Sequence, residues 1–367
     1  MVFRGKGDFL SIGTASEIDS LLAVSGRIGA DPMLVQAATG NTSIKLDDVL
    51  WIKASGKWLA HANREEILVP VSLTETIRRV ETNTDPAGQT AIVAGKTLGT
   101  SVETAMHAVI PHRVVLHVHS VNAIAWAVRS DGEAHLRERL QGLVWKWIPY
   151  LPSGLPLASA IRTAVKAQPE IQVFILANHG IVICGDTPLG TEALLREVET
   201  RIAIAPRTVP EPAWDDLNAI AERIGWRVPA NPAVHALGMD PICRKMLAGG
   251  TLYPCQAIFL APRVPMVSQF VSPSDAAEID SAYVLVENRG TLLRQRQNPV
   301  EGLTLAGLAQ VVLRLPEDAP IAYLAQKDVN DLLCADVYHY RERVEDNGAD
   351  RLPFHNQPSG EPTVELR

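Results

Sequence analysis

The most constraining stretch of this chain is residues 114–120, an apolar run that is interrupted by two histidines, His117 and His119. Its valines, and the proline just before it, predict a buried β-strand. Side chains two residues apart leave a strand on the same face, so both imidazoles are expected to point the same way. Two buried imidazoles need polar partners. Either a divalent metal ion or hydrogen bonds within the core would supply them.

The size and charge of the chain limit the class of protein. With 367 residues, 47% hydrophobic and 20% charged, it is typical of a soluble α/β protein of two domains. A net charge of -7 argues against nucleic acid or an anionic membrane as the main partner. No stretch approaches the roughly 18 apolar residues of a membrane span, and the first ten residues lack the pattern of a signal peptide. We therefore expect a cytoplasmic protein.

The cysteines are scattered and have no CxxC spacing, which predicts neither a disulfide framework nor a thiolate metal site. We expect them to be reduced thiols in the core. They are Cys184, Cys243, Cys255 and Cys334.

The N-terminal part contains two polar clusters that accompany a predicted hairpin. A helix is predicted over residues 16–28, with Ser16 as its N-cap. Two short strands follow, and residues 47–48 join them. Gly40-Asn41 and Ser55-Gly56 are residue types that let backbone N–H groups approach a bound anion. Ordinary turns are the alternative interpretation of these clusters.

A third histidine follows a second apolar strand. Residues 173–177 and 180–185 predict strands on either side of Asn178-His179-Gly180. His179 is either a third metal ligand or a turn histidine that hydrogen-bonds to the backbone. Helices are predicted over residues 72–80, 97–110, 121–129, 158–167 and 187–204. In the second of these, Glu103 and His107 are four residues apart and would share a face.

The proline-rich stretch 206–212 predicts a boundary between domains 1–208 and 209–367. In the second domain we predict helices over 214–224, 303–315 and 327–344 and strands over 257–261 and 282–286, followed by a polar tail from residue 346. Residues 283–293 echo residues 174–183, with Arg289 in the place of His179. This echo predicts a degenerate partial repeat that cannot bind metal, because arginine has no lone pair to offer as a ligand.

Five motifs, taken together and in this order, resemble the class II aldolase/adducin family, which includes fuculose-phosphate and rhamnulose-phosphate aldolases and ribulose-phosphate 4-epimerase. The resemblance covers residues 15–205 and implies a three-layer α/β/α domain with a central antiparallel-rich sheet. A smaller α/β C-terminal domain would follow. Family members are commonly homo-oligomers, above all tetramers. The motifs are Gly40-Asn41-Thr42-Ser43, Ala54-Ser55-Gly56, Glu103 with His107, His117-Val118-His119-Ser120 and Asn178-His179-Gly180.

The resemblance also implies a role for each residue that matches a family motif. His117, His119 and His179 would hold a divalent metal, usually Zn²⁺, with Mn²⁺, Co²⁺ and Fe²⁺ as alternatives. Glu103 would be the acid/base. For His107, four residues after Glu103, we separately expect a supporting or structural role. The residues that match the phosphate-holding region of the sugar-phosphate aldolases are Gly40, Asn41, Ser55, Gly56 and Ser101.

Two departures from the family pattern concern the substrate. Val102 stands where the short aldolases have a second phosphate-binding serine, and residues 132–147 contain no counterpart of the tyrosine that some relatives use as proton donor. The pattern is closer to longer relatives, some of which have a dehydrogenase domain. Residues 209–367 lack its GxGxxG fingerprint.

The expected function is therefore that of a metal-dependent aldolase. Three imidazoles leave an open coordination position, where a small hydroxy-keto compound, a sugar or sugar phosphate, would bind and be cleaved through a metal-stabilised enediolate. Epimerisation or decarboxylation on the same scaffold is an alternative. A non-catalytic, adducin-like binding or assembly module is another, although such a module would not need three histidines and Glu103.

Overall fold

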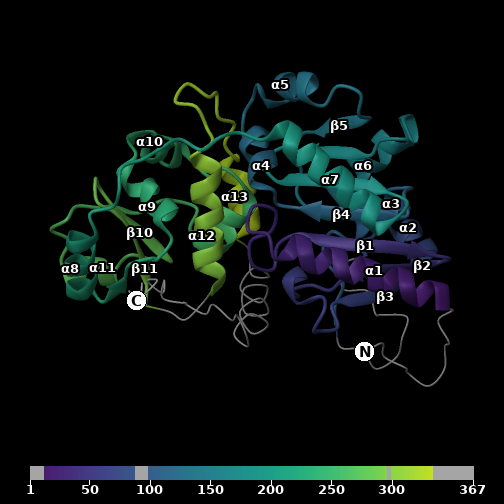
Figure 1. Ribbon diagram of the computed structural model, residues 1–367, viewed down its shortest axis with the longest axis horizontal. Coiled ribbons are helices and arrows are strands. Elements are labelled where there is room, and N and C mark those ends of the chain that lie inside the picture. Colours follow the sequence, from purple (N-terminus) through teal and green to yellow (C-terminus); the bar gives the residue numbers. More distant parts are fainter. Residues whose placement is uncertain (1–11, 87–97, 296–298, 334–367) are drawn as a thin grey trace, which may run out of the picture.

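A computed structural model describes residues 12–86, 98–295 and 299–333. These residues form two lobes, each built on its own β-sheet (Figure 1). We call the lobe with the larger sheet the first unit and the lobe with the smaller sheet the C-terminal unit; the domain boundary at residue 208 stays a prediction.

The sheet of the first unit has seven strands within the described residues. Every neighbouring pair is antiparallel except β5 and β6, which are parallel. The antiparallel-rich central sheet expected from the sequence is thus confirmed. In spatial order the strands are β3 (Leu68–Ser72), β2 (Val49–Lys53), β1 (Asn41–Leu46), β4 (Val114–Val118), β7 (Gly180–Gly185), β6 (Val173–Leu176) and β5 (Trp145–Ile148).

Helices cover both faces of this sheet and make three layers. Because side chains alternate along a strand, Leu116 of β4 packs with the helices of one face and Val115 with those of the other. His117 is therefore directed to the face of Val115. That face is covered by α2 (Leu73–Glu81), α3 (Thr104–Val109) and α6 (Leu155–Ala167); the opposite one by α1 (Ile12–Gly29), α4 (Val121–Ala127), α5 (Gly132–Arg139) and α7 (Pro188–Ile202).

The C-terminal unit is a smaller α/β lobe. Its strands have the order β8 (Trp226–Arg227), β11 (Gly290–Arg294), β10 (Tyr283–Val286) and β9 (Met266–Val267). Helix α12 (Pro299–Val312) stands between the lobes and packs against α4, so the two units share one apolar core (Figure 1). The other helical elements are α8 (Trp214–Ile224), α9 (Pro232–Met239), α10 (Pro241–Gly249), η2 (Gln256–Leu260), α11 (Pro273–Ala277) and α13 (Gln326–Leu332).

Two predicted helix boundaries in the first unit are wrong. Helix α1 already includes Ile12, so Ser16 lies inside it and is not its N-cap. The helix predicted over 97–110 is confined to α3, because Ser101 accepts a hydrogen bond from the backbone N–H of Glu103 and fixes a turn before the helix. Glu103 consequently occupies the N-cap position of α3, while residue 97 lies outside the described residues.

Two predictions in the C-terminal unit also need correction. Residues 257–261 are not a strand but belong largely to the π-helical turn η2, which packs against α12. A short, fully apolar run does not distinguish a strand from a buried helix. The predicted helix over 327–344 ends at Leu332 as α13, and residues from 334, including Cys334 and the tail, lie outside the described residues. The other three cysteines are buried and free, as expected.

The smaller sheet has the same strand order as part of the larger one. Successive pairs in β8-β11-β10-β9 are antiparallel, antiparallel and parallel, as are those in β4-β7-β6-β5. In each unit a helix follows the first strand, α4 or α9, and another follows the hairpin, α7 or α12. The two sheets therefore agree both in chain order and in pairing.

The two hairpins also agree at their turns. Asn178 and Asn288 have positive φ angles of 52° and 58°. The next residue, His179 or Arg289, donates its backbone N–H to the carbonyl of the last residue of the preceding strand, at 3.1 Å and 3.0 Å. The echo in the sequence thus corresponds to one strand–turn–strand geometry. That the C-terminal unit is a degenerate partial repeat stays a prediction.

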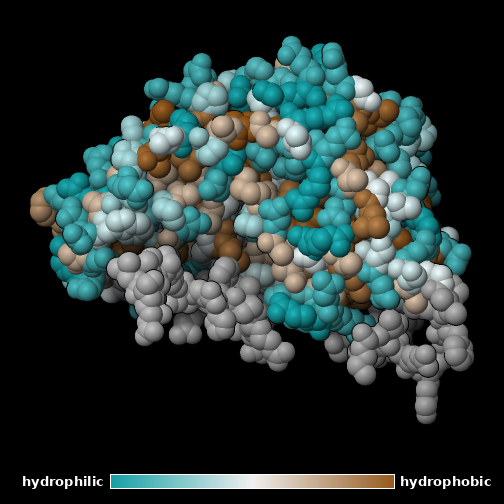
Figure 2. All heavy atoms as spheres, viewed as in Figure 1, coloured by the Kyte–Doolittle hydropathy of each residue, from teal (hydrophilic) through white to brown (hydrophobic). Residues whose placement is uncertain are grey.

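Figure 2 shows that hydrophilic side chains cover most of the face drawn, with hydrophobic residues in separate groups. Among the described residues, no helix has the length and apolar character needed to span a membrane.

Candidate metal centre

Three histidines converge on the face of the sheet that α3 covers. His117 lies in β4, His119 directly after that strand, and His179 in the turn between β6 and β7. Their ring centroids are 4.9–5.0 Å apart, and one ligand nitrogen from each lies within 4.8 Å of the others. All three are buried. The two separate apolar runs of the sequence therefore bring their imidazoles together.

The state of His117 is suited to a metal ligand. Its Nδ1–H donates to the carbonyl of Ile181 at 3.0 Å, so in the neutral ring, the form that binds a metal, the lone pair is on Nε2. Within the part of the chain that the structure describes, Nε2 is buried without a hydrogen-bond partner. A buried nitrogen of this kind, directed at two further imidazoles, fits a divalent cation.

Glu103 lies against the same cluster. Its Oε1 is 3.4 Å from Nε2 of His117 and 3.2 Å from Nε2 of His179, and Ser153 donates to this oxygen at 3.3 Å. Its Oε2 accepts a hydrogen bond of 2.6 Å from the amide of Asn41. Burial by itself would raise the pKa of Glu103, but the charge and N–H groups of His117 and His179 in their protonated form outweigh burial and hold the pKa well below its usual value.

A hydrogen-bonded chain orients the amide of Asn41. The side-chain oxygen of Asn41 is bonded to Nε2 of His107, whose Nδ1 is 2.7 Å from Oγ of Ser43. Because the amide oxygen can only accept, Nε2 carries the proton and Nδ1 accepts from the serine. Burial, and then the neighbouring His117, hold the pKa of His107 well below its usual value, so the ring stays neutral. His107 thus contacts Asn41, which bonds Glu103; its supporting role stays a prediction.

Of the two predicted anion-binding loops, the first contacts Glu103 through Asn41, and the second is joined to the segment that precedes Ser101. Gly40 has a φ of +67°, and a Cβ there would meet the carbonyl oxygen of His117 at 2.7 Å, so this position requires glycine. Gly56 also has a positive φ, of 74°. The backbone N–H of Ser55 donates to the carbonyl of Gly99 at 3.0 Å, which joins this loop to the segment that leads to Ser101.

The structure adds three residues that the sequence did not single out. Ser153 bonds Glu103, as described above. Lys53 is only 3% exposed and donates to the carbonyls of Ala38, at 3.0 Å, and Lys57, at 2.7 Å. Cys255 of the C-terminal unit places its Sγ 3.3 Å from Nδ1 of His119. A lysine inside an apolar strand was a signal for Lys53, whereas no local pattern indicated the other two.

Comparisons with known proteins identify the family of this chain. The sequence model of the family described as "Class II Aldolase and Adducin N-terminal domain" matches residues 20–205. An L-fuculose phosphate aldolase of Methanococcus vannielii is 31% identical over 183 residues, which are 47% of this chain and 86% of that protein.

Two further proteins each match about half of the chain. A Bacillus subtilis protein named uncharacterized oxidoreductase YuxG is 27% identical over 184 residues, 46% of this chain but only 27% of that protein's length. The solved N-terminal class II aldolase domain of a conserved protein from Thermoplasma acidophilum is 23% identical, with a TM-score of 0.43, and the alignment covers 55% of this chain and 98% of that one. This chain therefore belongs to the class II aldolase and adducin N-terminal domain family.

Proposed function

We propose that this protein is a metal-dependent aldolase that cleaves a carbon–carbon bond in a small hydroxy-keto compound, a sugar or a sugar phosphate. The convergence of His117, His119 and His179 beside Glu103 is the observation that most supports this proposal. A fold kept only for binding or assembly would have no use for three buried imidazoles around one point.

The three histidines would hold the cation, with Zn²⁺ as the first candidate because imidazole suits it well. When bound, the metal supplies a Lewis acid for negative charge that develops on substrate oxygens. Glu103 would move the proton at the substrate carbon through Oε1. Its depressed pKa keeps the carboxylate ionised, which is the form that can accept a proton. The bonds from Asn41 and Ser153 fix the direction of both carboxylate oxygens.

The loops around Glu103 would bind the polar end of the substrate. Backbone N–H groups at Gly40 and Gly56 and the side chains of Asn41, Ser55 and Ser101 are the groups that we propose for this role. Val102, between Ser101 and Glu103, is 47% exposed and adds an apolar side chain next to these polar groups.

The test is the variant Glu103→Gln, compared with the wild type for metal content and for aldehyde release from a panel of ketose phosphates. We expect the metal content to be unchanged and turnover to fall by about 10²-fold or more, because glutamine cannot take the proton. Glu199→Gln, at a half-buried carboxylate of α7 on the opposite face of the sheet, is the control and should keep its turnover.

Three results would contradict the proposal. The first is a wild type that takes up no divalent metal when it is supplied. The second is a Glu103→Gln variant with wild-type turnover. The third is conversion of substrate without any change in its carbon skeleton, which would instead favour epimerisation.

A further inference from the structure

The C-terminal unit contacts the turn that presents His179. Asn178, buried and in the left-handed conformation, donates both hydrogens of its side-chain amide, one to the carbonyl of Leu252 at 2.8 Å and one to that of Ala322 at 2.6 Å. Neither carbonyl belongs to the first unit. The amide of Asn178 therefore fixes the turn to two separate segments of the C-terminal unit.

The same part of the C-terminal unit contacts a second histidine. Cys255 follows Leu252 by three residues, and its Sγ lies 3.3 Å from Nδ1 of His119. Gln256 holds this short segment in shape, because its side-chain oxygen accepts from the N–H of Leu252 at 2.9 Å. We call residues 251–256 the bracing segment.

A histidine ligand needs its second ring nitrogen held, because that contact sets the tautomer and the direction of the coordinating nitrogen. For His117 the first unit supplies the contact, through the carbonyl of Ile181. For His119 it comes from Cys255, and the turn of His179 depends on Asn178. We propose that the bracing segment, together with Ala322, positions two of the three imidazoles, so that the C-terminal unit is a structural part of the metal centre.

The C-terminal unit retains the geometry of the metal-bearing sheet but not its ligands. The register of β8 on β11, and the shared geometry of the two hairpin turns, identify the positions that correspond to the three histidines. None has an imidazole; they are Val228, Ala230 and Arg289. A unit that only supports the metal centre of its neighbour needs to keep the fold but needs no metal ligands of its own. The absence of imidazoles at these positions therefore agrees with this inference, which rests on the proposed function.

The first test compares Asn178→Gly with Asn288→Gly in the full-length protein. Glycine adopts the left-handed conformation readily, so each variant loses an amide side chain without straining its turn. Metal-free protein is titrated with Co²⁺ alone, and the affinity is measured by competition with a chelator. We expect Asn178→Gly to weaken Co²⁺ binding by about tenfold or more and Asn288→Gly to change it by less than about twofold.

The second test concerns Cys255. Cys255→Ala removes the contact to His119 and should weaken Co²⁺ binding, whereas Cys255→Ser keeps a hydrogen-bonding atom and should restore part of the affinity. Thermal unfolding followed by circular dichroism checks that both variants are folded. The visible spectrum of bound Co²⁺ should change in Cys255→Ala, because the direction of one ligand changes.

The outcomes separate this inference from the proposed function. Wild-type protein that binds no Co²⁺ overturns both. If the folded Asn178→Gly and Cys255→Ala variants bind Co²⁺ as tightly as the wild type does, the positioning role is overturned and the proposed function is not. A strong sulfur-to-cobalt charge-transfer band in the wild type also overturns it, because Cys255 would then be a ligand itself.

Discussion

At the scale of single residues, Lys53 is a buried lysine whose ammonium group is held by hydrogen bonds next to the candidate site. Its ammonium group donates to backbone carbonyls of the two loops that we propose for substrate binding. Burial lowers the pKa of Lys53 to about 8, although the nearby Glu103 opposes this shift. The charged form of this side chain is therefore less favoured in the folded protein than in the unfolded chain.

This leads to a prediction about pH. Between the folded pKa and the ordinary lysine value of about 10.4, the unfolded chain binds more protons, so the free energy of unfolding rises with pH. Relative to Lys53→Met, which lacks the titrating group, the wild type should gain about 2 kcal/mol between pH 7 and pH 10. Urea unfolding of both proteins at each pH measures the difference. A constant difference, or one of opposite sign, would contradict the assignment.

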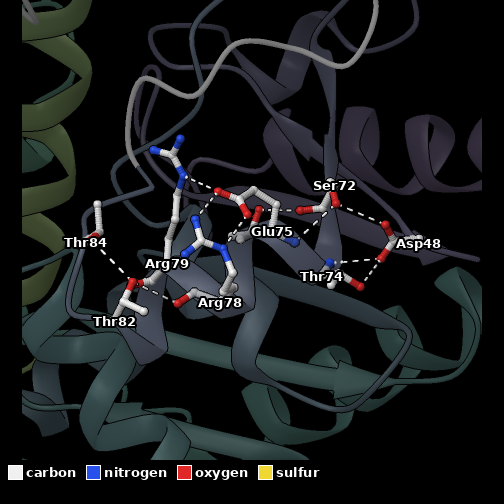
Figure 3. A network of polar contacts seen from close by, with 9 residues as sticks. Asp48, Ser72, Thr74, Glu75, Arg78, Arg79, Thr82 and Thr84 are labelled. Carbon is white, nitrogen blue, oxygen red and sulfur yellow. Dashed lines mark hydrogen bonds and ion pairs between the residues drawn. The ribbon is translucent and has the colours of Figure 1, made fainter.

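At the scale of elements, helix α2 is fixed at its start by a polar network (Figure 3). Ser72 accepts a hydrogen bond from the backbone N–H of Glu75 and donates to Asp48, which also accepts from Thr74. These bonds hold the N-terminus of α2 against the β1–β2 hairpin. Three hydrogen bonds from Thr74 and Ser72, led by the side chain of Thr74, lower the pKa of Asp48.

Ser72→Ala tests this cap. We expect the free energy of unfolding to fall by about 1 kcal/mol, the usual cost of losing a serine N-cap. Ser72→Thr keeps the hydroxyl and should retain most of the stability. Both are measured by urea unfolding. Equal stability of the alanine variant and the wild type would mean that the network contributes nothing.

At the scale of the whole molecule, the shared core joins the two units. Leu308 of α12 is fully buried in one apolar cluster with Ile124 of α4 and Tyr283 of β10. Gly307, beside it, approaches Gln36 of the first unit so closely that a Cβ would lie 2.6 Å from Cγ of that glutamine. Contacts of this density predict that the units unfold together.

Leu308→Ala is the corresponding variant. The cavity should lower the free energy of unfolding by about 2–5 kcal/mol, and unfolding should remain a single transition. Leu189→Ala, at a position that is 61% exposed, is the control and should change stability by less than about 0.5 kcal/mol. Denaturation followed by circular dichroism and by tryptophan fluorescence measures both the free energy of unfolding and the number of transitions. Two separate transitions would show that the units are independent.

Much of the fold was predictable because its signals are local. The hairpin β1–β2, the strands around Asn178-His179-Gly180 and the helices α2, α6 and α7 follow from periodicity, turn residues and apolar runs. The edge strands β5 and β9 and the turn η2 were not predicted or were assigned wrongly. These segments are short, so their conformation depends more on burial in the folded protein than on the intrinsic strand or helix propensity of their residues.

The sequence by itself determined the two histidines of one strand, the third at a strand reversal and the order of motifs that indicated the family. Only the tertiary structure decided which groups surround them. Ser153 reaches Glu103 from a loop 50 residues further along the chain, and Cys255 reaches His119 from 136 residues further. Local sequence patterns cannot predict contacts between residues so far apart in the chain, because the packing of whole elements sets these contacts.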